Sequence, residues 1–216
     1  MKPLFLLCLS LCFASTLQAA EPIKISWQDL RGKIAPYEDP FIDLSNDQLY
    51  HLSISARITE LQKKAPEKVT PEMLDAAESA KAALIAEKLD IDYLLAQRLI
   101  LMEKRQQAAV ATNPTLADKQ IEMPGYMLAI EFDGELVSEF LLVPVVGACS
   151  HKPVPPANQI VFVKTKTPVK AGSPYMPIVV TGQLRLKPQA KDLYLVDGSK
   201  RIEMAYSIED ATIEPF

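Results

Sequence analysis

The hydrophobic period of this chain changes near residue 111, and no other feature constrains its fold as strongly. Over residues 45–110, apolar side chains recur at intervals of three and four, which is typical of helices with one buried face. From residue 120 onward the period is two, which is typical of strands whose alternate side chains face a core. The sequence therefore predicts an α+β fold, in which an N-terminal helical segment precedes a β-domain.

About three helices are expected in the helical region. The first begins at Ser45, because Gln48 follows it at the spacing of a capping box. The second begins at Thr70–Pro71, the favoured order for an N-cap followed by a first-turn proline. The third begins at Asp90 or Asp92. Because the second and third helices are rich in alanine, we expect them to pair as an antiparallel hairpin.

Residues 21–44, ahead of these helices, are expected to form an extended docking segment. Within it, residues 23–44 have an apolar start and two prolines. Trp27, Tyr37 and Phe41 are the apolar side chains that we expect it to bury.

Five to seven short strands are expected within residues 120–216. The dipeptide Asp133–Gly134 is a hairpin turn signal between two alternating runs. Gly182 lies in phase with the buried face of its strand, which indicates a tight bend or a bulge. Together these strands predict a small antiparallel, OB-like β-barrel, with a β-sandwich as the alternative.

The first twenty residues have the organisation of a secretory signal peptide. Lys2 provides a positive charge, Leu4–Ala14 is apolar, and small residues precede a cleavage position after Ala19 or Ala20. The apolar run is too short to cross a bilayer, and no later segment is long and apolar enough to do so. The sequence therefore predicts removal of residues 1–20, export to the periplasm, and no membrane span after cleavage.

The charge balance argues against two classes of partner. The chain has 23 basic and 27 acidic residues, for a net charge of −4 at pH 7. A mildly acidic chain with mixed charges has neither the basic footprint of a nucleic-acid binder nor a basic face for anionic lipid. We therefore expect no nucleic-acid partner.

Cysteine usage singles out one position. Cys8 and Cys12 leave with the signal peptide, so Cys149 is the one cysteine of the exported chain, and His151 follows it closely. A thiolate and an imidazole are good ligands for zinc or copper. Two ligands do not fill a zinc site, so a metal bound by Cys149 and His151 would need a partner or a second copy to complete it.

Two alternatives to metal binding stay open for Cys149. It could be the nucleophile of a thiol-dependent envelope enzyme, with His151 as its base. However, the order Gly-Ala-Cys-Ser-His lacks the arginine of exported cysteine transpeptidases, and no other catalytic motif is evident. The pattern therefore leans away from an enzyme. In the second alternative, Cys149 is a structural thiol in a protein-interaction module.

The loop around this cysteine, residues 147–159, is the candidate binding site. Its prolines hold the chain near polyproline II and remove amide donors, so the loop is extended at low entropic cost. The two amides that follow can bond loop carbonyls. The candidate loop residues are Gly147, Pro153, Pro155, Pro156, Asn158 and Gln159.

The stretch "VPVVGACSHKPVPPANQIVFV" resembles the signature of DUF3299, a family of exported bacterial proteins of unknown function. The segments "ISWQDL", "YEDPF", "MPGYMLAIEFDG" and "PIVVTGQL" extend the resemblance over most of the chain. It implies that Gly147, Cys149, His151 and Asn158–Gln159 form the family's site. Ser150 departs from the aliphatic residue expected there, and Val154 interrupts the proline run.

The resemblance implies no established activity. Some members of the family lie beside transporter components, including those of metal uptake. It therefore implies, as partner, an envelope transporter or another periplasmic protein, and as function an accessory or binding role with transition-metal handling.

Overall fold

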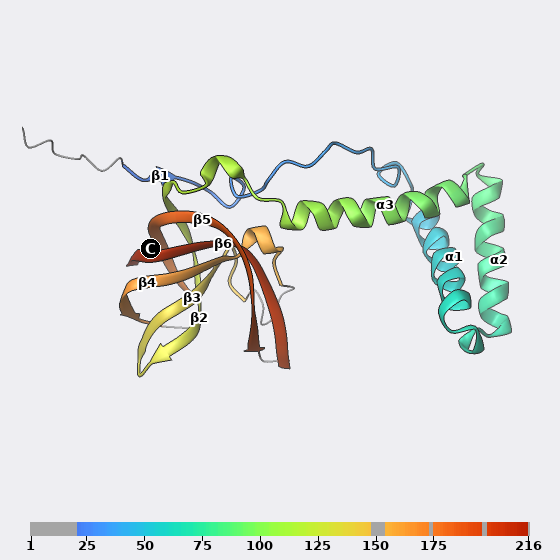
Figure 1. Cartoon of the computed structure of the whole chain (residues 1–216). Coiled ribbons are helices and arrows are strands. Elements are labelled where there is room, and N and C mark those ends of the chain that lie inside the picture. The colour runs from blue at the N-terminus through green and yellow to red at the C-terminus, as the bar shows by residue number, and fades with distance from the viewer. Residues whose placement is uncertain (1–20, 148–153, 173–174, 196–197, 216) are drawn as a thin grey trace, which may run out of the picture.

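The computed structural model describes residues 21–147, 154–172, 175–195 and 198–215. Within these ranges the chain forms a helical arm and a β-barrel, which helix α3 joins (Figure 1). The predicted α+β class, with helices before strands, is confirmed.

The helices begin where the capping residues predict. They are α1 (Asn46–Lys64), α2 (Pro71–Ala86) and α3 (Ile91–Val110). The Ser45 hydroxyl accepts a hydrogen bond from the Gln48 amide N–H, and the Gln48 side chain accepts one from the Ser45 N–H, so the capping box is complete. The side chains of Thr70 and Asp90 cap the other two helices by accepting hydrogen bonds from the backbone N–H groups of Met73 and Tyr93. These polar caps satisfy N–H groups that have no partner inside a helix.

The pairing of the helices differs from the expectation. α1 lies alongside α2, and α3 runs across their ends (Figure 1), so the predicted hairpin of α2 with α3 is wrong. Lys88, with a φ of 61°, adopts the left-handed conformation just after α2. This residue turns the chain sharply, and α3 leaves across α2 rather than back along it. Small buried residues, Ser55 and Ala56 on α1 and Ala77 and Ala80 on α2, allow close helix packing instead.

The extended segment runs beside α3, from the barrel to the arm (Figure 1). The backbone N–H of Gly32 donates a 2.9 Å hydrogen bond to the oxygen of Ala111, at the far end of α3. Trp27 packs against the barrel core, and Phe41 packs against the small core of the arm, as expected. Tyr37 is 39% exposed, so the expectation of burial is wrong for that side chain.

The described residues form six strands: β1 (Ile23–Lys24), β2 (Gln120–Asp133), β3 (Leu136–Val143), β4 (Val161–Lys170), β5 (Met176–Leu195) and β6 (Gly198–Pro215). β2 and β3 join at the predicted Asp-Gly turn, where Gly134 has a φ of 63°. A positive φ is strained for most residues and easy for glycine, which explains the turn.

Five of the strands close into a barrel in the order β2-β3-β4-β6-β5, and β5 returns to pair with β2. β4 and β6 run parallel, while the other four pairings of the barrel are antiparallel. The barrel is therefore mixed, and the prediction of an antiparallel barrel is corrected by the β4–β6 pair. β5 follows β4 along the chain but does not pair with it, because β6 lies between the two. β6 is antiparallel to β5 and therefore runs in the same direction as β4. A five-stranded barrel is the architecture of OB-folds, but the OB-like identity stays a prediction.

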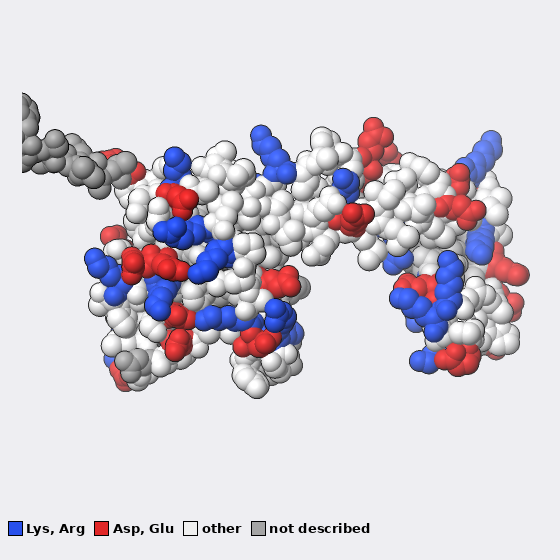
Figure 2. All heavy atoms as spheres, in the orientation of Figure 1, with Lys and Arg blue, Asp and Glu red and all other residues white. Residues whose placement is uncertain are grey.

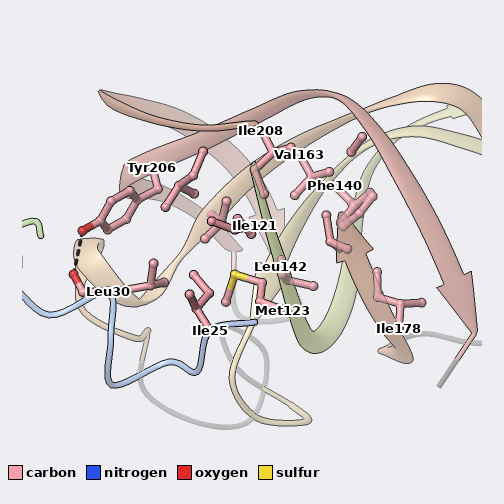
Figure 3. Close-up of a cluster of buried hydrophobic side chains, with 14 of the residues drawn as sticks. Ile25, Leu30, Ile121, Met123, Phe140, Leu142, Val163, Ile178, Tyr206 and Ile208 are labelled. Atoms are coloured by element: carbon pink, nitrogen blue, oxygen red, sulfur yellow. Dashed lines mark hydrogen bonds between the residues drawn. The ribbon is translucent and has the colours of Figure 1, made fainter. Parts of the chain in front are cut away.

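The barrel interior is filled by alternate side chains from every strand. Figure 3 shows Ile121, Phe140, Val163, Ile178 and Tyr206 pointing into one cluster, and all five are fully buried. The alternation predicted from the sequence is therefore the inward and outward alternation of a closed sheet.

β5 and β6 are longer than the short strands expected, with 20 and 18 residues. A register shift lies next to Gly182, between Thr181 and Gln183. This shift confirms the predicted bulge, and a side chain at Gly182 would also overlap with the Ile208 side chain. Past the bulge, near the turn that joins them, β5 and β6 contribute Leu193 and Ile202 to a second apolar cluster.

In the ranges that the structure describes, no helix combines the length and the apolar composition needed to cross a bilayer.

Candidate functional site

The candidate loop connects the end of β3 to the start of β4, at one end of the barrel. Cys149, His151 and Pro153 lie outside the described residues. Gly147, Pro155, Pro156, Asn158 and Gln159 are described, and they show how the two ends of the loop are held.

Gly147 forms the first fixed point of the loop. It is buried and has a φ of 78°, in the left-handed region that glycine adopts without strain. Val145 and Val146, just before it, are 42% and 52% exposed. The chain therefore passes from an exposed apolar pair into a buried turn as it enters the loop.

The second fixed point is a short helical turn, η3 (Ala157–Gln159). Pro156 precedes it with φ −56° and ψ 152°, close to polyproline II, as the proline pattern predicts. The backbone N–H of Gln159 donates a 2.8 Å hydrogen bond to the oxygen of Pro156. Pro155 is half-buried and Pro156 is exposed.

The side chains of Asn158 and Gln159 tie this turn to two distant segments. Asn158 is 2% exposed, and its amide nitrogen donates hydrogen bonds of 2.7 Å to the backbone oxygens of Ala108 and Ala111. Gln159 is 4% exposed, and its amide donates a 2.9 Å bond to the backbone oxygen of Trp27. The Gln159 amide also donates a 2.8 Å bond to the backbone oxygen of Asn158, so the predicted bond to a loop carbonyl is found there. The other bonds of these two amides reach the end of α3 and the extended segment, which the sequence did not predict.

Tyr206 completes this junction from inside the barrel. Its hydroxyl donates a 2.6 Å hydrogen bond to the backbone oxygen of Leu30 and accepts one from the backbone N–H of Asn113 (Figure 3 shows the bond to Leu30). The Asn113 side chain donates a further bond to the oxygen of Asp29. Burial raises the pKa of the Tyr206 phenol above its ordinary value of 10.0. The phenol therefore stays protonated and able to donate.

A small aromatic and proline-lined pocket of 190 Å³ lies beside the end of β3, where the loop begins. Trp27 and Tyr126 provide its rings, and Pro124, Pro144 and Pro177 provide much of the remaining wall. The indole N–H of Trp27 is used internally, because it donates a 3.0 Å bond to the oxygen of Pro124. The sequence marked Trp27 as an anchor but missed this pocket, since its walls come from four separate segments.

Gly125 sets the shape of that pocket. A Cβ at this position would lie 2.8 Å from the Leu142 side chain and 3.0 Å from the Trp27 ring. The absence of a side chain therefore lets the indole lie against β2.

A larger hollow of 470 Å³ lies beside η3. Val110 from α3 and Ala157 from η3 face Met204 and Ala205 of β6 across it. Gln189 also lines the hollow, and its amide nitrogen is buried without a hydrogen-bond partner in the described part of the chain. The two ends of the loop thus adjoin two separate hollows.

The other histidine, His51, lies on α1 in the arm, far from the barrel end that carries the loop (Figure 1). It is not brought together with the loop. In the described ranges, no three side chains of His, Cys, Asp or Glu are grouped as they would be around a metal ion.

The fold and this site define a class of protein with a closed mixed barrel, a helical arm and a loop fixed at both ends. The chain belongs to the DUF3299 family, described as a protein family of unknown function, whose model matches residues 27–215.

The chain is also similar to the crystal structure of a DUF3299 family protein from Pseudomonas aeruginosa PAO1. The likeness has a TM-score of 0.51 and 23% sequence identity, and it covers 91% of this chain and 97% of that one. At this identity it shows the shared fold. A comparison with curated proteins gave no match.

Proposed function

We propose that this chain is an exported accessory protein of the bacterial envelope that binds a transition metal ion at the loop of residues 147–159. Cys149 and His151 are its ligands, and zinc or copper is its metal. A partner protein, such as an envelope transporter, or a second copy of the chain supplies the remaining ligands. The signal-peptide pattern of residues 1–20 supports export, and the thiol–imidazole pair supports the metal.

The observation that carries this proposal is that the loop begins in a buried turn at Gly147 and ends at amides bonded to α3 and to the extended segment. Gly147 holds one end in a buried turn, and Asn158 and Gln159 hold the other through bonds of 2.7 to 2.9 Å. A segment whose ends are already held loses less conformational entropy when it binds a ligand. Pro155 and Pro156 restrict the backbone of the loop before η3, which lowers this cost further.

Metal titration of the reduced chain from Glu21 onward tests the proposal. In competition with a chromophoric chelator, the wild-type chain is expected to take up one zinc or copper(I) ion per chain, or one per two chains where a second copy completes the site. Cys149→Ala and His151→Ala are expected to lose this binding. His51→Ala is the matched control, because the chain has two histidines and this one lies in the arm.

Equal metal uptake by the wild type and by Cys149→Ala contradicts the proposal, and so does the absence of uptake by the wild type. Circular dichroism of each variant establishes that a lost site is not a lost fold.

Export has its own test. When the full chain is produced in a bacterium, the protein in the periplasmic extract is expected to begin at Ala20 or Glu21, as read from its intact mass. Full-length chain that stays in the cytoplasm contradicts export.

A further inference from the structure

The small pocket beside the end of β3 is a candidate binding site of its own, with no part in metal binding. Its lining consists of two aromatic rings, three prolines and one glycine: Trp27, Tyr126, Pro124, Pro144, Pro177 and Gly125. We call it the Trp27 pocket. Val145 and Val146, which are both exposed, directly follow Pro144 in the chain, so further apolar surface lies next to that proline.

The walls of the Trp27 pocket are held in place by the barrel. The indole N–H of Trp27 donates its 3.0 Å hydrogen bond to the backbone oxygen of Pro124, and the ring packs against the barrel core. Tyr126 belongs to β2 and is paired on both sides, with Val143 of β3 and with Pro177 of β5. A pocket that is already formed loses little conformational entropy when it binds a ligand.

The size of the pocket restricts its occupant to one ring or one side chain. Sites for drug-sized ligands have volumes of roughly 300–1,000 Å³. At about 30 Å³ for each water molecule, the 190 Å³ of this pocket corresponds to about six waters. A side chain of a partner protein fits this size and, unlike a free molecule of the same size, gains further contacts at Val145 and Val146.

The charges around the pocket favour an uncharged occupant. Among the described residues, no side chain of Lys, Arg, His, Asp or Glu lines it. On the face of the barrel that Figure 2 shows, basic and acidic side chains are interspersed, so no large patch of one sign attracts a charged ligand there. Recognition of phosphorylated or acidic segments uses clusters of arginine, and this pocket has no arginine in its wall.

Two other modes of peptide recognition do not fit this site. A strand cannot be added beside Tyr126, because β3 and β5 already pair with it on both sides, and Pro124, Pro144 and Pro177 have no N–H to donate. An amphipathic helix needs a groove that accepts side chains from two or more turns, whereas this pocket accepts one. The mode that fits is docking of a polyproline II segment, whose prolines pack into aromatic-lined sites.

Tyr126 provides the polar contact for such a segment. Polyproline II has no internal hydrogen bonds, so its carbonyls are free to accept one. The Trp27 indole cannot donate it, because its N–H is bonded to Pro124. Tyr126 is half-buried, and its hydroxyl is in contact with solvent and has no hydrogen-bond partner in the described part of the chain. This hydroxyl is therefore available to a ligand.

We infer that the Trp27 pocket binds a proline from an extended, uncharged segment of a partner protein. The proline ring packs against the indole, and the Tyr126 hydroxyl donates a hydrogen bond to a carbonyl of the segment. This inference concerns the pocket, and it does not depend on metal binding at the loop.

Titration with a decaproline peptide tests the inference. With its ends acetylated and amidated, this peptide is uncharged, adopts polyproline II and offers a proline at every position. Trp27 is the one tryptophan of the chain, so its fluorescence and its indole N–H signal in NMR both report on the pocket. With the chain from Glu21 onward, decaproline is expected to shift both signals with a dissociation constant of about 1 mM or lower. A Gly-Ser peptide of the same length is expected to shift neither.

Two variants locate the binding. Tyr126→Phe removes the hydroxyl and keeps the ring, and it is expected to raise the dissociation constant about threefold to tenfold. Pro177→Ala removes one wall of the pocket and is also expected to weaken binding. Tyr194→Phe is the matched control, because this tyrosine is 92% exposed and lies outside the pocket, and it is expected to leave the dissociation constant unchanged.

Three results overturn the inference. The first is a wild type whose Trp27 signals stay unchanged at several times this peptide concentration. The second is equal binding of the Gly-Ser peptide, which would remove the preference for proline. The third is an affinity that neither Tyr126→Phe nor Pro177→Ala lowers, which would place the peptide elsewhere. The dispersion of the NMR spectrum of each variant shows that the barrel remains folded.

Discussion

The side-chain amide of Asn158 donates a 2.7 Å hydrogen bond to the backbone oxygen of Ala111. The first residue belongs to the turn that ends the candidate loop, and the second follows the last residue of α3. Carbonyls at the end of a helix have no partner within the helix. One buried amide therefore stabilises the end of α3 and fixes the place where the loop rejoins the barrel.

Replacing Asn158 with alanine is expected to lower the free energy of unfolding by about 1–3 kcal/mol, because a buried amide is lost, the Ala108 oxygen loses this donor, and the Ala111 oxygen loses one of its two donors, Asn158 and Gly32. Asn158→Asp is expected to cost more at neutral pH, since a carboxylate oxygen would then face the same carbonyls. Urea titrations of both variants measure these changes. Asn46→Ala, at an exposed amide in the first turn of α1, is the control. A stability of Asn158→Ala within error of the wild type contradicts this role.

Tyr206 is expected to make the stability of the barrel depend on alkaline pH. Desolvation raises the pKa of its phenol above 10.0, so as pH rises the unfolded chain loses this proton before the folded chain does. Stability from this group is therefore complete below pH 10.0 and is lost as pH rises through the raised pKa.

The difference in unfolding free energy between the wild type and Tyr206→Phe, measured by urea titration across this pH range, isolates the effect from the lysines. The variant is expected to be less stable at neutral pH, by about 1–3 kcal/mol, and to lose less stability above pH 10.0. Parallel pH profiles for the two proteins would mean that the phenol titrates as it does in water.

Gly182→Ala is expected to destabilise the barrel by about 1–3 kcal/mol, because the new methyl group overlaps with the branched methyl of Ile208. Ile208→Leu removes that branch, so the double variant is expected to recover part of the loss. Gly172→Ala is the control, since its nearest contact would be an ordinary 3.7 Å to the Met176 sulfur. Thermal unfolding checks the series. Equal stabilities for Gly182→Ala and the wild type would mean that the strands can separate at this point.

The local features of this fold could be predicted from the sequence because their causes are local. Ser45 caps α1 through an amide three residues away, and Gly134 permits its turn through its own backbone. The parallel pairing of β4 with β6 could not be predicted. Alternation shows which side chains of a strand are buried, but it does not show which strand is its neighbour. The pairing of α1 with α2 was missed for the same reason, since alanine content does not select a partner.

In the candidate site, too, the features with local causes could be predicted and those that depend on distant residues could not. The turn at Gly147 and the polyproline geometry at Pro156 are properties of the residue types, and the sequence predicted a stiff loop there. Apart from the bond between Gln159 and its neighbour Asn158, the partners of these two amides lie 47 to 132 residues away, so no local pattern identifies them. The pocket of Trp27 and Tyr126 was missed because it exists only once the barrel has closed.

Zinc X-ray absorption of the reduced chain tests metal binding by the loop most directly, because it reports the ligand atoms themselves. With one equivalent or less of zinc, the wild type is expected to show a sulfur shell at about 2.3 Å and a nitrogen shell at about 2.0 Å. Cys149→Ala is expected to lose the sulfur shell, and His151→Ala to lose nitrogen intensity. A wild-type spectrum without sulfur, or one that Cys149→Ala leaves unchanged, would contradict metal binding by Cys149 and His151.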